Sequence, residues 1–207
     1  MPKYRVLGCS DNGISECVSA IRNGGVIVFP TDTIYGIGCD PYSDSAVERI
    51  FKIKGRDEKK PLPVLAYSLQ DAERIVSLGR AGKIFAGKYW PGALTIVAPL
   101  IDKKISRRVT ASINSLAVRV PANSCTLSLL KQCKYLVGTS ANLSGGKSSN
   151  SAQGVMRSGL DGFDILLDGG SVGGVESTIV DMTGAQPRIL REGAIKSSEV
   201  LRLIAQV

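Results

Sequence analysis

Three short stretches of the sequence combine cations, hydroxyls and glycines in a way that suits an anionic ligand. The first, KIKGRDEKKP at 52–61, carries five cations in nine positions. Gly55 interrupts it between Lys54 and Arg56, so both side chains can turn to one side, and arginine offers phosphate a planar fork of donors. The same charges also suit a solvated helix end, because cations are favoured near a helix C-terminus. The glycine between the two cations favours a polyphosphate clamp.

The second stretch, GTSANLSGGKS at 138–148, follows a short apolar segment. Its backbone N–H groups, with Ser140, Asn142 and Ser148, can form a nest for phosphate oxygens. The GGKS fragment is not a P-loop, because GxxxxGK[ST] requires glycine at position 141 and the chain has Ala141. A plain loop is the alternative interpretation.

The third stretch, PTDTIYGIGCDP at 30–41, comes directly after the apolar run 26–29. Hydroxyls, an acid and close-approach glycines suit a loop that holds a small polar molecule, and they suit an ordinary turn as well. Further along, Arg119 is a lone charge in the apolar segment SLAVRVP, where it either faces solvent or meets an anion. Ser177, in GGVEST, and Arg191, in RILREG, lie at the ends of strand-like segments. Taken singly, these residues are more often structural than functional.

The composition narrows the chemistry further. The 207 residues include no histidine, which excludes histidine-based triads, most zinc sites and the usual general base near neutral pH. A formal net charge of +8 points to anionic partners. Aromatic residues make up only 5% of the chain, without the interleaving of basic and aromatic residues typical of RNA-recognition motifs. A nucleotide is therefore favoured over a nucleic acid.

The elements that must position these residues can be predicted from periodicity and from helix-stop signals. They mix strands and helices without a strict repeat, which predicts a single α/β domain over residues 1–207, built on a twisted mixed parallel and antiparallel sheet flanked by helices. Strands are predicted at 4–7, 26–29, 64–66, 94–98, 116–120, 135–137, 165–167, 178–180 and 188–190, and helices from about 12, at 45–54, from 68, near 124–132, at 151–158 and at 198–205.

Two further expectations concern the compartment. No apolar run approaches the roughly 20 residues that span a bilayer, and the N-terminus has no apolar signal core, so the chain is expected in the cytoplasm and not at a membrane. The five cysteines, Cys9, Cys17, Cys39, Cys125 and Cys133, form no CxxC pair. Buried reduced thiols are expected.

Taken in order, these stretches resemble the YrdC-type threonylcarbamoyl-AMP synthase family. The resemblance covers about residues 10–193, and the family's KxR and SxN signature is present at Lys54, Arg56, Ser140 and Asn142. The segments that carry it are FPTDTIYGIGCDP, KIKGRDEKKPLPVL, YWPGALTIV, SLAVRVP, GTSANLSG, ESTIVD and RILREGAI.

This resemblance implies a concave, positively charged cavity on a twisted α/β fold. It also implies an enzyme, a nucleotidyltransferase that converts L-threonine, bicarbonate or CO₂, and ATP into L-threonylcarbamoyladenylate and pyrophosphate. The product would supply the t6A modification of transfer RNA through separate transferase machinery. Mg²⁺ is expected on the ATP phosphates, with no metal site on the protein.

The family's site residues can be carried over position by position. Lys54 and Arg56 would be catalytic, and Thr33, Arg119, Gly138 and Ser177 would bind L-threonine, with Tyr35 nearby. The ATP site would use Arg56, Lys60, Ser115, Ser140, Asn142, Ser148 and Arg191.

Two departures keep alternatives open. Leu65 stands where many family members have a histidine that contacts threonine, and Lys60 stands where asparagine is common. A paralogue with a different carbamoyl-type or nucleotide reaction is one alternative, and a non-enzymatic RNA-binding module is the other. Weak RNA binding is also compatible with catalysis. The polar, glycine-hinged KGRDEKKP segment is the candidate lid.

Overall fold

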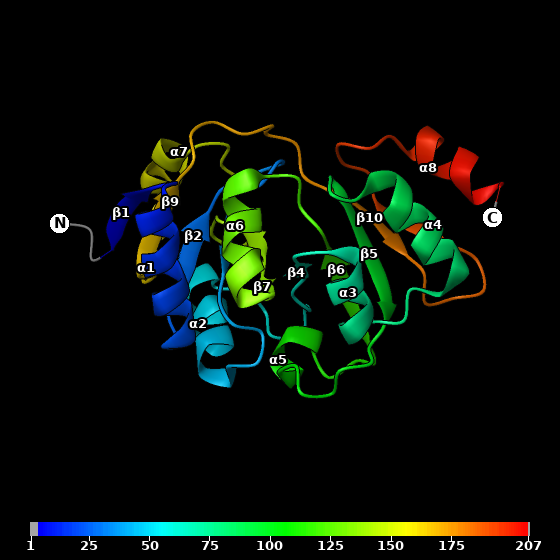
Figure 1. The fold of residues 1–207 in the computed structure, drawn as a ribbon, viewed down its shortest axis with the longest axis horizontal. Coiled ribbons are helices and arrows are strands. Elements are labelled where there is room, and N and C mark those ends of the chain that lie inside the picture. Colours follow the sequence, from blue (N-terminus) through cyan, green and yellow to red (C-terminus); the bar gives the residue numbers. More distant parts are fainter. Residues whose placement is uncertain (1–3, 207) are drawn as a thin grey trace.

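Two sheets and eight helices make up the fold in the computed structural model, which describes residues 4–206 (Figure 1). The five-stranded sheet has the order β1 (Arg5–Gly8), β9 (Ile165–Asp168), β2 (Ile27–Phe29), β3 (Gly36–Gly38) and β8 (Thr139–Ser140). The six-stranded sheet has the order β11 (Arg188–Arg191), β10 (Thr178–Asp181), β5 (Leu94–Pro99), β6 (Ser115–Arg119), β4 (Val64–Ala66) and β7 (Tyr135–Val137).

Both sheets contain parallel and antiparallel pairs, as the sequence predicts. In the first sheet β9 runs parallel to both β1 and β2, and β3 pairs antiparallel with β2 and β8. In the second, β10 pairs parallel with β5, and β4 pairs parallel with β6 and antiparallel with β7. The prediction of one sheet is wrong, because the chain leaves the six-stranded sheet after β7 and enters the five-stranded sheet as β8. Gly138 is the residue between these two strands.

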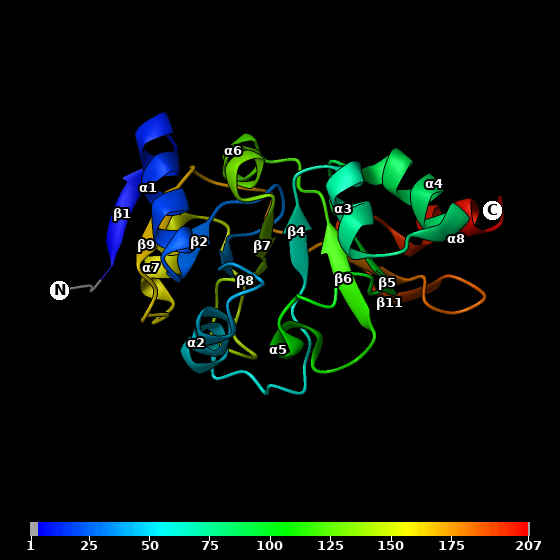
Figure 2. The same ribbon diagram turned by 60° about the horizontal axis from the view of Figure 1, so that its bottom comes forward.

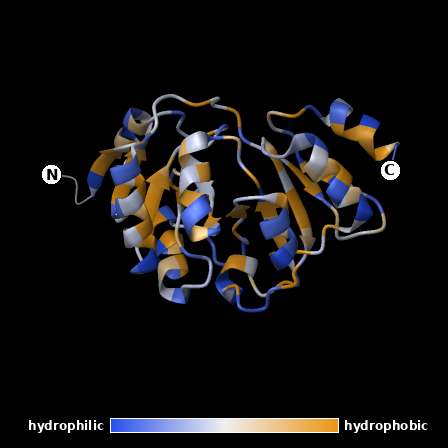
Figure 3. Ribbon diagram, in the orientation of Figure 1, coloured by the Kyte–Doolittle hydropathy of each residue, from blue (hydrophilic) through white to orange (hydrophobic). Residues whose placement is uncertain are grey.

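Helices cover the sheets with their apolar faces turned inward, and in Figure 3 most strands are coloured hydrophobic while helices carry both colours. On α1, Cys17, Val18 and Ile21 are buried and join Leu129 and Leu130 of α6 in one core cluster. Figure 2 shows α1, α2 and α7 beside the first sheet and α3, α4 and α8 beside the second. The helices are α1 (Asp11–Arg22), α2 (Asp44–Lys54), α3 (Leu69–Ile75), α4 (Gly79–Tyr89), α5 (Arg107–Thr110), α6 (Ser124–Cys133), α7 (Ala152–Arg157) and α8 (Ser197–Ile204).

Side-chain caps lie at most of the predicted helix starts, and α8 is the exception because its N-cap residue Lys196 makes no side-chain hydrogen bond. Ser68 precedes α3; its hydroxyl accepts a hydrogen bond from the Asp71 N–H at 3.1 Å and donates to the Asp71 carboxylate at 2.7 Å, which caps the helix at the predicted start. Gly55 ends α2 with a φ of 57°, a left-handed conformation that favours glycine. β3, β8, α4 and α5 were not predicted.

The expectation of five reduced thiols is wrong for one pair. Cys9, in the turn before α1, is disulfide-bonded to Cys125 in the first turn of α6, across 116 residues of sequence. The fold brings their Cα atoms to 5.9 Å, which no local spacing could reveal. Cys17 and Cys39 are free and buried, and Cys133 is free and half-buried. Within residues 4–206, no helix is long and apolar enough to span a membrane.

Candidate functional site

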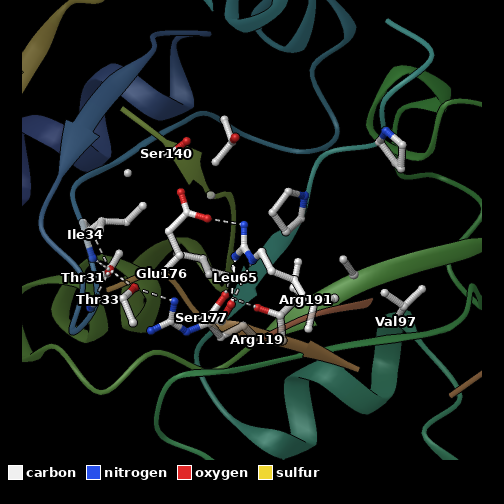
Figure 4. Close-up of a pocket in the computed structure, with 18 of the residues that line it drawn as sticks. Thr31, Thr33, Ile34, Leu65, Val97, Arg119, Ser140, Glu176, Ser177 and Arg191 are labelled. Carbon is white, nitrogen blue, oxygen red and sulfur yellow. Dashed lines mark hydrogen bonds and ion pairs between the residues drawn. The ribbon is translucent and has the colours of Figure 1, made fainter. Parts of the chain in front are cut away.

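A cavity of about 290 Å³ lies where the two sheets meet, and it contains a majority of the predicted site residues (Figure 4). Side chains alternate along a strand, so Ala117 and Arg119 of β6 face it together. Within residues 4–206, its charged lining side chains are Arg56, Arg119, Arg191 and Glu176. The full lining is Thr31, Thr33, Ile34, Gly36, Arg56, Pro61, Pro63, Leu65, Thr95, Val97, Ala117, Arg119, Gly138, Thr139, Ser140, Glu176, Ser177, Ile179, Leu190 and Arg191.

Arg119 is the buried cation of this cavity, 5% exposed. Its Nε donates to the Gly92 carbonyl at 2.8 Å, Nη1 to Thr33 Oγ1 at 2.9 Å, and Nη2 to the Asp32 carboxylate at 2.6 Å. Burial lowers the pKa of Arg119 and the Asp32 carboxylate opposes that shift. A guanidinium has five N–H groups, so two have no partner among the described residues. They suit a carboxylate, which arginine binds through paired donors.

The loop that carries Thr33 is held by its own side chains. Thr31 Oγ1 donates to the Ile34 carbonyl at 2.6 Å and contacts Thr33 Oγ1 at 2.9 Å. Tyr35 is fully buried; its hydroxyl donates to the Gly170 carbonyl at 2.7 Å, which ties the loop to the segment after β9. Asp32 also accepts from the Ala122 N–H at 2.9 Å. The loop therefore presents the Thr33 hydroxyl in a fixed position beside Arg119.

A second polar group lies on the β10 side of the cavity. Arg191 donates through Nε and Nη2 to the Ser177 carbonyl at 3.1 and 2.9 Å, and its Nη1 forms an ion pair with Glu176. The other Glu176 oxygen accepts from Ser148 Oγ at 2.7 Å. Ser177 Oγ contacts Thr95 Oγ1 at 2.9 Å. Figure 4 shows Glu176 and Arg191 beside each other, joined by a dashed line, with Ser177 below them.

The two residues of the predicted KxR pair lie in different places, Arg56 in the cavity lining and Lys54 behind it. Arg56 lines the cavity, and its guanidinium donates to the Pro61 carbonyl at 3.0 Å. Lys54 is 2% exposed; its ammonium donates to the Asn142 carbonyl at 2.7 Å and to the Ser140 carbonyl. Burial, reinforced by the Arg56 charge and opposed by Glu176, lowers the pKa of Lys54 to about 8. Lys54 thus fixes the 140–142 backbone from behind the lining.

Close packing shapes the part of the cavity wall formed by Leu65 and Gly138. Leu65 of β4 is the register partner of Arg119 in β6 and is 3% exposed. A Cβ on Gly138 would lie 2.5 Å from Leu65 Cγ, so only glycine fits there without a shift. The cavity wall beside Arg119 is therefore apolar.

The structure brings seven of the predicted residues to this one cavity: Thr33, Arg56, Arg119, Gly138, Ser140, Ser177 and Arg191. Ser115 lies on the same face of β6 as Arg119, but at the far end of the strand and outside the lining. The exposed Lys60 precedes the lining residue Pro61. Asn142 is 6% exposed and its buried side-chain oxygen has no partner in the described part of the chain. Sequence reasoning left out Asp32, Thr95 and Glu176, because only the fold shows what they pair with.

The donor set fits a metal carried by a substrate. Across residues 4–206, no three or more His, Cys, Asp or Glu side chains gather in a way that could hold a metal ion, and Glu176 is the one carboxylate in the lining. Mg²⁺ is commonly held by one or two carboxylates together with phosphate oxygens and water. The cavity can therefore assist a magnesium–nucleotide complex without holding the ion alone.

Known proteins resemble this chain in sequence. The chain is 34% identical over 190 residues to threonylcarbamoyl-AMP synthase of Pyrococcus abyssi and 33% identical over 205 residues to that of Bacillus subtilis, covering 90% and 97% of this chain. It spans 56% and 59% of the length of those two proteins.

Solved structures agree with the fold. The crystal structure of P. abyssi Sua5 complexed with L-threonine superposes with a TM-score of 0.92 at 31% identity, covering 98% of this chain and 61% of that one. The structure of E. coli YciO, at 24% identity, has a TM-score of 0.85 and covers 96% of this chain and 99% of that one, which supports the fold alone. The model of the Sua5/YciO/YrdC family, described as telomere recombination, matches residues 19–193. The chain belongs to the Sua5/YciO/YrdC family.

Proposed function

We propose that this chain is an L-threonylcarbamoyladenylate synthase, which forms its product and pyrophosphate from L-threonine, bicarbonate or CO₂, and ATP. The observation that carries the proposal is that one cavity is lined both by a buried arginine with two N–H groups unpartnered among the described residues and by two further arginines. Arg119 with Thr33 suits an amino-acid carboxylate, and Arg56 with Arg191 suits phosphates. The relatives of 33–34% identity bear the name of this activity.

The reaction requires no nucleophile from the protein, which suits a chain without histidine. The threonine amine and CO₂ form a carbamate, one carbamate oxygen attacks the α-phosphorus of ATP, and pyrophosphate leaves. Mg²⁺ on the phosphates would neutralise part of their charge. The protein holds two anions together and stabilises the charge that develops on the leaving group.

The residues divide this work by position. Arg119 and Thr33 would orient the amino acid, while Arg56, Arg191 and Ser140 would bind the nucleotide. Lys54 would act as a positioning residue, since its ammonium holds the backbone of residues 140 and 142. Lys60, Ser115, Asn142 and Ser148 would complete the proposed nucleotide site. The Asn142 side-chain oxygen, which has no partner among the described residues, would accept a hydrogen bond from the ligand. Separate transferase machinery would consume the adenylate to modify transfer RNA.

The direct test is pyrophosphate release from ATP and Mg²⁺, with and without bicarbonate, comparing L-threonine, L-serine and no amino acid. Release that depends on both threonine and bicarbonate is expected. Arg56→Ala should lower turnover by roughly 10²–10³, the scale of a lost charge-stabilising donor. Lys52→Ala, which removes an exposed cation from the last turn of α2, four residues before Arg56, is the matched control. Unchanged turnover in Arg56→Ala would contradict the assignment.

Leu65 favours a second candidate, a paralogous nucleotide-handling enzyme with another amino-acid substrate. Its buried side chain lies beside Arg119 and makes that wall of the cavity apolar. In the same assay, pyrophosphate release with a more apolar amino acid that exceeds release with L-threonine would favour this candidate.

A further inference from the structure

Glu176 is a carboxylate inside a cavity whose other charged lining residues, among those described, are arginines. Its side chain is 35% exposed, so it is neither buried nor free in solvent. One oxygen accepts from Ser148 Oγ at 2.7 Å and the other pairs with Arg191 Nη1. Both partners belong to the proposed nucleotide site. The carboxylate therefore occupies donors that an incoming phosphate would use.

The Arg191 guanidinium is held in place, so it cannot readily reorient to bind a phosphate away from the Glu176 carboxylate. Its Nε and Nη2 donate to the Ser177 carbonyl at 3.1 and 2.9 Å, which fixes the plane of the guanidinium. Nη1 is the terminal nitrogen that remains directed to Glu176. Nη1 carries a second N–H with no partner among the described residues, so a phosphate oxygen that binds it lies directly against the Glu176 carboxylate unless that carboxylate is displaced.

The Glu176 backbone is also anchored. Its carbonyl accepts from the Ala194 N–H at 2.8 Å, and the Gly174 N–H donates to the Thr33 carbonyl at 2.5 Å two residues earlier. Displacing the carboxylate thus requires a change of side-chain rotamer and not a movement of the segment. After displacement it stays beside the phosphates, where two like charges repel each other unless a cation lies between them.

We infer that Glu176 is a specificity-determining residue that occupies the anion site of the empty cavity and selects for nucleotide carrying a divalent cation. An anion without metal that binds Arg191 or Ser148 either displaces the Glu176 carboxylate from these donors or binds beside it, and in both positions it lies near a negative charge. A magnesium nucleotide meets the same carboxylate as a ligand for the ion. This inference rests on the nucleotide site of the proposed function, and it does not require the threonine reaction.

Calorimetric titration with inorganic pyrophosphate and with ATP, first in EDTA and then in excess Mg²⁺, tests the inference. Glu176→Gln keeps the shape and the acceptor oxygen but removes the charge. It should bind both metal-free anions about tenfold more tightly than wild type, equivalent to about 1.4 kcal/mol. The gain should shrink when Mg²⁺ is present. Glu192→Gln is the matched control, because Glu192 engages Lys196 and Ser197 and lies outside the lining.

Four results would overturn the inference: equal or weaker metal-free binding in Glu176→Gln, the same gain in Glu192→Gln, a gain undiminished by Mg²⁺, or no anion binding by either protein. A further check combines the two substitutions: in the Arg191→Gln background, adding Glu176→Gln should give little of the tenfold gain in metal-free anion binding. Because these titrations contain neither threonine nor bicarbonate, they are independent of pyrophosphate release. A tenfold gain without threonine-dependent turnover would support the role of Glu176 and refute the proposed synthase activity.

Discussion

Gly138 lies so close to Leu65 that adding one methyl group should destabilise the protein. The Cβ of an alanine at 138 would lie 2.5 Å from Leu65 Cγ and 2.7 Å from Cδ1. Leu65 is 3% exposed and packed in a core cluster, and the clash falls on its branch carbon, so relief requires a shift of the whole side chain. Overpacking of this kind costs about 1–3 kcal/mol, and we expect Gly138→Ala to lower the free energy of unfolding by that amount.

Truncating Leu65 should remove the destabilising effect of a methyl group at position 138. Leu65→Ala alone should cost about 2–5 kcal/mol, because it empties a buried site. In the Leu65→Ala background, however, the methyl group at 138 enters vacated space, so its cost should fall to near zero. The two substitutions should therefore show a coupling of about 1–3 kcal/mol, as contacting residues do.

Equilibrium unfolding in urea of the wild type, both single variants and the double variant measures this coupling. Gly87→Ala is the control, since a Cβ there meets nothing within 4 Å in the exposed part of α4. It should raise the free energy of unfolding by about 0.5–1 kcal/mol, because alanine is the better helix former. Strictly additive effects of Gly138→Ala and Leu65→Ala would refute the steric explanation.

Three further predictions follow from charges in the fold. Burial lowers the pKa of Lys54 to about 8 from 10.5, so the unfolded chain binds the extra proton between these values. The unfolding free energy of wild type, relative to Lys54→Met, should be flat below pH 8 and rise by about 3 kcal/mol toward pH 10.5 in denaturant titrations. Asp32→Ala should lower the unfolding free energy by about 3–5 kcal/mol, measured in the same way, because it leaves the buried Arg119 charge unpaired. Burial pulls the pKa of Asp164 upward, but hydrogen bonds from Arg49 and the Val26 N–H outweigh it and hold that pKa below its usual 3.8. The stability that Asp164 contributes is complete above about pH 4 and lost as pH falls through the lowered pKa. The melting temperature of Asp164→Asn should therefore fall less steeply than that of wild type as the pH is lowered below about 4.

Elements with strong local signals could be predicted from the sequence. The helix start at Ser68 and its stop at Gly55 depend on side-chain caps and backbone freedom, which a short window contains. β3 was missed because its glycines look like a turn. A Cβ on Gly38 would lie 1.8 Å from the Val137 carbonyl oxygen, and one on Gly36 would lie 3.2 Å from the Phe29 ring. Close approach requires glycine at 38 and favours it at 36, and both contacts are visible only in three dimensions.

α4 was missed for a related reason. Three glycines, at 79, 82 and 87, lower its helix propensity, and its N-cap residue Leu78 makes no side-chain hydrogen bond. Tertiary packing of Phe85 and Ala86, both buried, stabilises the helix instead.

For the candidate site, the sequence could indicate which residues belong together but not how they bond. Arg119 was recognised as a charge that burial would leave in need of a partner, yet its partner Asp32 lies 87 positions earlier. Likewise, nothing in the local sequence joins Ser148 to Glu176. Such pairs are set by the meeting of the two sheets, which no short window contains.

The order of strands in the first sheet bears on how the chain can fold as it leaves the ribosome. β9 is the central partner of both β1 and β2, so Arg5 pairs with Ile165 across most of the chain. β1 and β2 therefore cannot complete their sheet before β9, at Ile165–Asp168, has been synthesised. Long-range pairing of this kind slows folding and leaves early strands exposed. We expect nascent chains that end before β9 to remain sensitive to protease, and chains that extend past it to become protected.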